Sequence, residues 1–70
     1  MSKRRKEVLP KIEAQRRSIR EHIDKYNRYP DEGDKKFALD TISRCQERIE
    51  VLKYQCSQSI DDSREDDWES

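Results

Sequence analysis

The sequence predicts an all-α protein, an antiparallel two-helix hairpin over about residues 7–27 and 34–58. Apolar residues recur every three or four positions along these two segments, and the chain's single glycine and one of its two prolines lie between them. Of the 70 residues, 46% are charged and 30% are hydrophobic, which is typical of exposed helices, coiled coils or disorder. We therefore expect helices where the apolar residues are periodic and disorder where they are absent.

The first segment carries a heptad seam with one polar member, Arg16. Its residues are Leu9, Ile12, Arg16, Ile19, Ile23 and Tyr26. Acidic residues precede basic ones by four positions on the exposed faces, as Glu13 precedes Arg17, and each such pair stabilises a helix by about 0.2–0.5 kcal/mol. Pro10 fits a helix that begins near residue 7, because the first turn does not use the N–H that proline lacks.

The second segment carries a more regular seam of Ala38, Ile42, Cys45, Ile49, Leu52 and Cys56. Phe37, Leu39 and Val51 flank this seam and widen the apolar stripe. Either Asp31 or Asp34 could cap the start of the helix through its side-chain oxygen. The connection between the segments is short enough to make the two helices antiparallel neighbours.

Two amphipathic helices bury too little apolar surface to offset the entropy of the chain, so we expect self-association. The simplest assembly is a dimer of hairpins that forms a four-helix bundle, with the two seams as the oligomer contact. A higher oligomer would bury the same residues. Arg16 would then fix the register, paired with a carboxylate of a neighbour.

The net charge is zero, but the charges are segregated along the chain. Residues 1–28 hold ten Lys/Arg against four Asp/Glu, whereas the last ten residues hold one against six. We expect a flexible basic arm over residues 1–6, the hairpin over 7–60 and a disordered acidic tail over 61–70. The tail could dock on a partner, interact with the body of the same or a neighbouring subunit, or only keep the protein soluble.

The sequence does not predict an enzyme, a cofactor or a metal site. His22 is the single histidine, and one glycine cannot build a phosphate-binding loop. Cys45 and Cys56 would lie about three turns apart on one helix, too far for a disulfide, so we expect reduced thiols and a cytoplasmic protein. No apolar run approaches the roughly 20 residues that span a bilayer, so no membrane association is expected.

Contacts with a partner or ligand are expected on basic residues and two exposed aromatic rings. A basic arm makes salt-sensitive contacts with phosphates, and a ring within a basic frame, such as Tyr29, can stack on a base. The candidate residues are Lys3, Arg4, Arg5, Lys6, Arg17, Arg20, Arg28, Tyr29, Lys35, Lys36 and Trp68.

The segment from residue 12 to residue 54 resembles the small phage proteins that sequester cyclic oligonucleotide signals of the CBASS defence system. The similarity consists of an Ile-led first helix, a proline before a charged turn, and an Ala-Leu-x-x-Ile-x-x-Cys run formed here by Ala38, Leu39, Ile42 and Cys45. The resemblance implies an oligomeric helical hairpin that binds a nucleotide. No binding residue is carried over from that family.

The leading hypothesis is a small non-enzymatic helical interaction protein that self-associates and binds a partner macromolecule, foremost a protein, as a regulator, adaptor or inhibitor. One alternative is an oligomeric nucleotide-binding protein, a cyclic oligonucleotide sponge of the phage anti-defence type. A second alternative is nucleic-acid binding through the basic N-terminal half.

Overall fold

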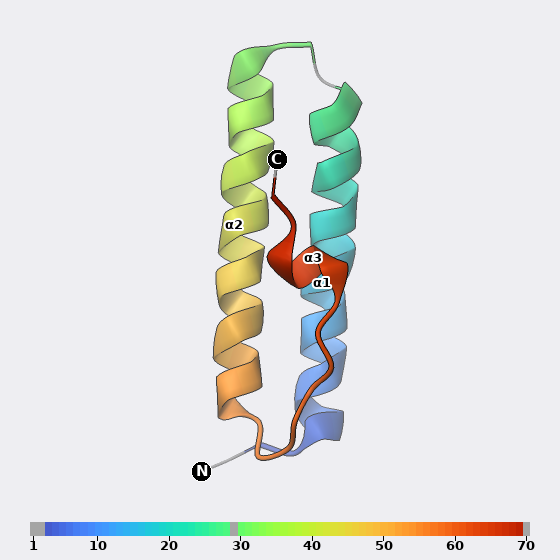
Figure 1. The fold of residues 1–70 in the computed structure, drawn as a ribbon, viewed down its shortest axis with the longest axis vertical. Coiled ribbons are helices and arrows are strands. Elements are labelled where there is room, and N and C mark those ends of the chain that lie inside the picture. The colour runs from blue at the N-terminus through green and yellow to red at the C-terminus, as the bar shows by residue number, and fades with distance from the viewer. Residues whose placement is uncertain (1–2, 29, 70) are drawn as a thin grey trace.

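The computed structural model describes residues 3–28 and 30–69. Two long helices, α1 (Arg5–Arg28) and α2 (Glu32–Gln55), lie side by side in opposite directions, and a short helix, α3 (Arg64–Asp67), lies across them (Figure 1). The molecule is a rod with principal extents of 44 × 15 × 15 Å. The predicted all-α hairpin is therefore confirmed.

Helix α1 begins at Arg5, two residues before the predicted start, which places Pro10 in its second turn rather than its first. The early start is stabilised by the side chain of Gln58, whose Oε1 accepts a hydrogen bond from the N–H of Arg5 at 3.2 Å. Pro10 has no N–H to donate to the carbonyl of Lys6 four residues earlier. Both residues are exposed, which allows solvent to take the place of that donor.

Asp31 is the residue that caps α2. Its Oδ1 accepts hydrogen bonds from the N–H groups of Gly33 at 2.7 Å and Asp34 at 3.4 Å. A Cβ at position 33 would lie 3.1 Å from the same oxygen, so glycine permits this close approach. The helix consequently begins at Glu32, two residues before the predicted start at residue 34. It ends at Gln55, three residues before the predicted end at residue 58.

The expected flexible arm is wrong for its described part, because Lys3 is bound to the end of α2. The N–H of Lys3 donates to the carbonyl of Gln55 at 2.8 Å, and the N–H of Ser57 donates to the carbonyl of Lys3 at 2.9 Å. The last carbonyls of a helix lack partners within the helix, and the backbone of Lys3 supplies one. Residues 1 and 2 of the arm lie outside the described residues.

The two predicted seams face each other inside one chain. The fully buried apolar side chains are Val8, Ile12, Ile19, Ala38, Ile42, Ile49 and Leu52. Val8 replaces Leu9 at the start of the first seam, because the longer helix continues the buried face four residues back from Ile12. Ile23, Tyr26, Cys45 and Cys56 are half-buried at the margin of this core.

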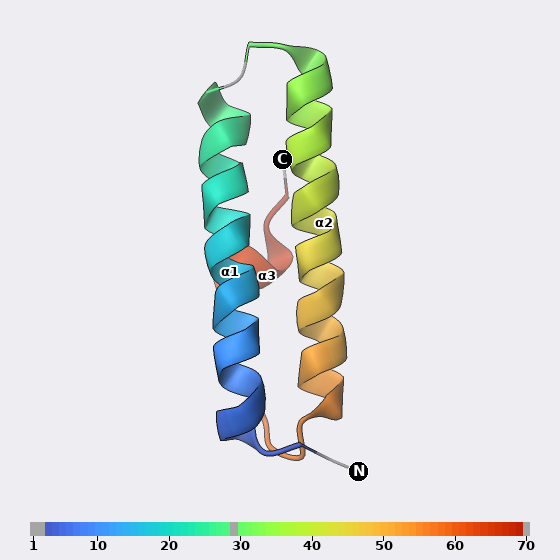
Figure 2. The same ribbon diagram turned by 180° about the vertical axis from the view of Figure 1, so that it is seen from behind.

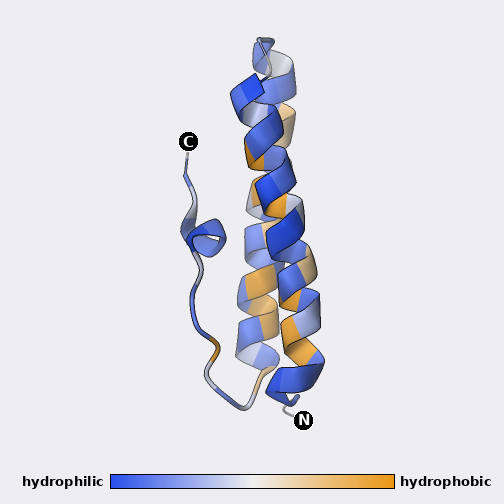
Figure 3. Ribbon diagram, turned by 90° about the vertical axis from the view of Figure 1, so that its right-hand side faces the viewer, coloured by the Kyte–Doolittle hydropathy of each residue, from blue (hydrophilic) through white to orange (hydrophobic). Residues whose placement is uncertain are grey.

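The expectation of a disordered tail is also wrong for residues 61–69. After Cys56 the chain turns back and runs along one side of the hairpin, where α3 lies against both long helices (Figures 1 and 3). Ile60 and Trp68 pack against the core cluster. Acidic residues from the far end of the sequence meet cations on the hairpin here, and no local pattern predicts such a pairing.

The other side of the hairpin is not covered by the tail, as the view from behind shows (Figure 2). Gln46 and Lys53 contact the tail from one flank of the α2 seam. Successive residues of an α-helix are rotated by about 100° around its axis, which places Phe37 and Val51 on the opposite flank, away from the tail. Phe37 is 69% exposed and Val51 45%. Leu39, the third flanking residue, is half-buried.

The core predicts a large difference between two apolar truncations in α2. Ile49→Ala should lower the free energy of unfolding by about 2–5 kcal/mol, because it leaves a cavity between the helices. Tyr54→Ala should change it by less than about 0.5 kcal/mol, because the ring is 91% exposed. Urea unfolding followed by circular dichroism measures both, and equal losses would contradict this description of the core.

Candidate functional site

The carboxylate of Asp66 lies at the centre of the contact between the tail and the hairpin. Arg16 donates from Nε to Oδ1 at 3.0 Å and from Nη2 to Oδ2 at 2.9 Å, and Lys53 donates from Nζ to Oδ2 at 2.7 Å. The backbone N–H of Ser63 donates to Oδ2 at 3.2 Å. The side chain of Asp66 is 1% exposed, so this ionised group is held almost entirely by donors of the protein. We call Arg16, Lys53 and Asp66 the carboxylate clasp.

Each member of the clasp comes from a different helix. Arg16 lies on the buried stripe of α1 between Ile12 and Ile19, and Lys53 lies one turn beyond Ile49 in α2. Asp66 is the third residue of α3, and its N–H donates to the carbonyl of Ser63 at 2.9 Å. The predicted carboxylate partner of Arg16 exists, but it belongs to the tail of the same chain.

The guanidinium of Arg16 makes further contacts that complete its desolvation. Nη1 donates to Glu13 Oε1 at 2.9 Å, and Nη2 also donates to the carbonyl of Asp61 at 2.8 Å. The planar fork of arginine matches a carboxylate with two parallel bonds, which makes the pairing geometrically specific. Within residues 3–28 and 30–69, no buried side-chain nitrogen or oxygen atom lacks a hydrogen-bond partner.

The clasp shifts the pKa values of its members in the direction that keeps all of them charged. Burial alone would raise the pKa of Asp66, but the bonds from Arg16, Lys53 and the Ser63 backbone outweigh it and lower that pKa to about 2. The hydrogen bond with Asp66 raises the pKa of Arg16. Burial would lower the pKa of Lys53, yet its bonds to Asp62 and Asp66 raise it.

The hairpin also contacts the backbone of the tail. The amide of Gln46 donates from Nε2 to the carbonyl of Glu65 at 3.1 Å and to that of Trp68 at 2.9 Å. The side chain of Glu65 is buried, and its pKa is lowered, first by the hydrogen bond from the Ser63 hydroxyl. Arg20 lies 3.8 Å from the Glu65 carboxylate.

Trp68 ends the docked segment in an aromatic contact. Its ring meets that of Tyr26 edge-on, with the centroids 5.7 Å apart and the planes at 78°. Nζ of Lys35 lies 5.6 Å from the centroid of the Tyr26 ring, within the range of a cation–π interaction. Two of the predicted contact residues, Lys35 and Trp68, therefore contact the same tyrosine.

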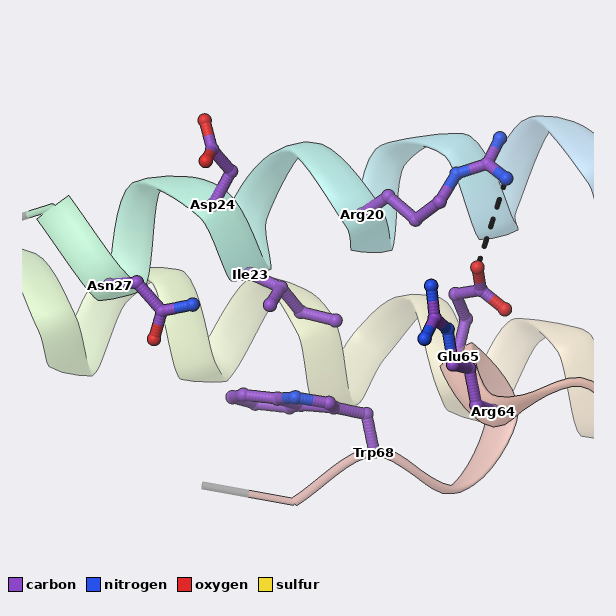
Figure 4. Close-up of a pocket in the computed structure, with 7 residues that line it drawn as sticks. All are labelled: Arg20, Ile23, Asp24, Asn27, Arg64, Glu65 and Trp68. Carbon is purple, nitrogen blue, oxygen red and sulfur yellow. Dashed lines mark ion pairs between the residues drawn. The ribbon is translucent and has the colours of Figure 1, made fainter.

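A groove of about 420 Å³ separates the tail from the C-terminal half of α1 (Figure 4). The ring of Trp68 lies beneath Ile23, and Arg20 reaches toward Glu65 at the other end. The remaining lining residues are Asp24, Asn27 and Arg64. Two arginines and two carboxylates line the groove, so its charge selects for neither anions nor cations.

The other predicted contact residues are spread over the molecule. Arg4, Arg5 and Lys6 line a groove of about 590 Å³ with Leu9, Ser57 and Gln58 at the N-terminal end of α1. Lys35 and Lys36 line a groove of about 450 Å³ near the hairpin connection, with Tyr26, Glu32, Gly33 and Leu39. Arg28 pairs with Asp24 at 3.3 Å, and Arg17 is exposed on α1. Tyr29 lies outside the described residues.

Sequence reasoning missed Gln46, Lys53, Glu65 and Asp66 as members of the site. The interruption of an apolar seam by Arg16 was the available signal, because a buried guanidinium requires a carboxylate. The tail offers six acidic residues, and their sequence does not show which one would reach Arg16.

His22 and the two cysteines have structural contacts. Nδ1 of His22 lies 2.8 Å from the carbonyl of Ser18, and Sγ of Cys45 lies 3.7 Å from Oγ of the same serine. Cys45 and Cys56 are free thiols. No group of three or more His, Cys, Asp or Glu side chains that could hold a metal ion occurs among the described residues, nor does any helix there suit a membrane crossing.

Comparisons of the chain with models of protein families, with curated proteins and with solved structures returned no match. The functional interpretation therefore depends on the contacts described above. Of these, the carboxylate clasp is the most completely buried polar arrangement, and it joins all three helices.

The lowered pKa of Asp66 predicts a loss of stability in acid. The unfolded chain binds a proton near the ordinary pKa of 3.8, whereas the folded protein resists protonation down to about 2. The clasp's contribution is therefore complete above about pH 5 and falls by about 2 kcal/mol as the pH drops to about 2. Urea unfolding of wild type and Asp66→Asn across this range measures it, since the difference between the two proteins should shrink as the pH falls.

Asp67→Asn provides the matched control, because Asp67 is the exposed neighbour of Asp66 on α3. At every pH, the free energy of unfolding of Asp67→Asn should exceed that of Asp66→Asn by as much as the wild-type value does. A constant stability gap between wild type and Asp66→Asn across the acid range would contradict the assigned pKa shift.

Proposed function

We propose that this chain is a small non-enzymatic helical interaction protein that self-associates and binds a partner macromolecule as a regulator, adaptor or inhibitor. The observation that carries the proposal is that the hairpin already holds an acidic peptide segment, its own residues 61–69, through side chains of both long helices. The free thiols of Cys45 and Cys56 support a reducing compartment such as the cytoplasm.

The contacts between hairpin and tail are of the kind that proteins use to bind peptides. A bidentate arginine recognises one carboxylate, an amide recognises two backbone carbonyls, and an aromatic side chain ends the docked segment. Residues 3–60 contain fifteen Lys/Arg and ten Asp/Glu, whereas residues 61–69 contain one and six. The basic body and the acidic tail are thus complementary in charge.

The environment of Asp66 supports a binding role over a catalytic one. Its carboxylate accepts four hydrogen bonds and has a pKa of about 2, so it is a poor proton acceptor near neutral pH. General acid–base catalysis needs a group whose pKa lies near the working pH and which reaches the substrate. The clasp instead fixes one segment of chain on another.

Self-association is supported by the side of the hairpin that the tail leaves uncovered. Phe37 and Val51 are exposed there on the same flank of α2. A second hairpin placed against this side would remove both from water and complete a four-helix bundle. In such a bundle the tails of both copies would lie on the outside.

Light scattering over a concentration series tests self-association directly. Wild type should have the mass of a dimer or a larger assembly, and Val51→Glu should shift it toward the monomer, because a carboxylate would be buried in the contact. Ser43→Glu, on the opposite flank of α2, should leave the mass unchanged. A wild-type monomer at every concentration would remove self-association from the proposal.

Nucleic-acid binding is the second candidate, favoured by the groove that Arg4, Arg5 and Lys6 line at the end of α1. Three cations beside an open groove can contact successive phosphates of a single strand. The nucleotide alternative has less support, because Lys35 already lies over the ring of Tyr26 in the groove near the hairpin connection.

The nucleic-acid candidate predicts binding that weakens steeply with salt. The logarithm of the affinity for a single-stranded oligonucleotide should fall with the logarithm of salt concentration, by about 0.7 for each phosphate contacted. Replacing Arg4, Arg5 and Lys6 together by Gln should reduce that slope by about two. Fluorescence anisotropy measures both slopes, and identical slopes for the two proteins would rule out this groove as the contact.

A further inference from the structure

We propose that the tail-binding side of the hairpin, formed by Arg16, Arg20, Gln46, Lys53 and Tyr26, is a docking site for an acidic segment of a partner protein, and that the chain's own tail competes with this partner. The segment has the pattern acid–Asp–any residue–aromatic, as in Glu65 to Trp68. This inference rests on the proposed function, because it names the partner class and the regulation of the same interaction protein.

The pattern follows from what the hairpin contacts at each position of the docked segment. The aspartate position is the most restrictive, because Arg16 and Lys53 enclose both oxygens of the Asp66 carboxylate. The preceding acid lies near Arg20. Asp67 points to solvent, so that position accepts other side chains. The aromatic position is set by the edge-on contact of Trp68 with Tyr26.

Gln46 adds a requirement on the backbone of the ligand. Its single amide nitrogen donates to two carbonyls, those of Glu65 and Trp68, which are three residues apart. The two oxygens come within reach of one donor because the segment between them forms the turn of α3. A partner segment must therefore be able to form one helical turn at its acidic residues.

The tail can leave this site without removing any residue of the apolar core. Among the described residues, all of the fully buried apolar side chains lie in α1 and α2, and the tail contributes Ile60 and Trp68 only at the margin. Once the tail leaves, the clasp cations would face water, where a guanidinium and an ammonium are well solvated. The hairpin is therefore a separable receptor for the segment that covers it.

Competition follows from the covalent connection between receptor and tail. A tethered segment has an effective concentration on the order of millimolar at its own site, so it occupies the site most of the time if its intrinsic dissociation constant is well below that concentration. A partner then binds with an affinity reduced by the fraction of molecules in which the site is open. Release of the tail also exposes the basic surplus of residues 3–60 to the acidic partner.

The test uses the full chain and a fluorescein-labelled peptide that copies residues 59–69, with binding measured by fluorescence anisotropy. Asp66→Asn weakens the tail in its own site and should bind the peptide about tenfold more tightly than wild type. Asp67→Asn should bind it as wild type does, since that side chain is exposed. A peptide with Asn at the position of Asp66, and a scrambled peptide of the same charge, should each bind Asp66→Asn at least about tenfold more weakly than the copy does.

Circular dichroism establishes first whether Asp66→Asn retains its helices. If it unfolds, Trp68→Ala takes its place, because that change loosens the tail and leaves the clasp carboxylate intact. Equal peptide affinity for wild type and the folded variant, or equal binding of the scrambled peptide, would overturn the proposal. Self-association in light scattering does not depend on the peptide, so it separates failure of this inference from failure of the proposed function.

Discussion

The burial of one guanidinium determines the arrangement of this molecule. Arg16 lies among isoleucines on the inner stripe of α1, and taking its charge out of water costs several kcal/mol without a partner. Asp66 supplies that partner with two parallel hydrogen bonds, and Lys53 donates a further hydrogen bond to the same carboxylate from the other helix. The path of the last residues follows from this pairing, because the tail must cross the hairpin at the height of Arg16.

The clasp attaches the tail to a hairpin that has only a small apolar core. In residues 3–28 and 30–69, seven apolar side chains are fully buried, all between α1 and α2. The tail adds hydrogen bonds and ion pairs rather than a second apolar layer. Ordering such a segment costs conformational entropy at every residue, and the charged hydrogen bonds offset that cost. The competitive role proposed for the tail requires that these two opposing contributions nearly cancel.

The two sides of the hairpin differ in chemistry. One side has cations and an amide, and it is covered by the acidic tail. The other side has exposed apolar residues on the flank of α2 and no segment of the described chain over it (Figure 2). A hairpin with two unlike sides can contact itself on one and a partner on the other, because neither contact occupies the surface that the other needs.

The sequence by itself determined the helical hairpin, since periodic apolar residues and a short turn are local properties that need no partner to be read. It also predicted which faces of the two helices are buried against each other, except that Val8 rather than Leu9 begins the buried face of α1. Only the tertiary structure showed where the tail lies and which residues form the clasp. Arg16 and Asp66 are fifty positions apart, and an acidic tail looks disordered until a buried cation on a distant helix gives one of its carboxylates a partner.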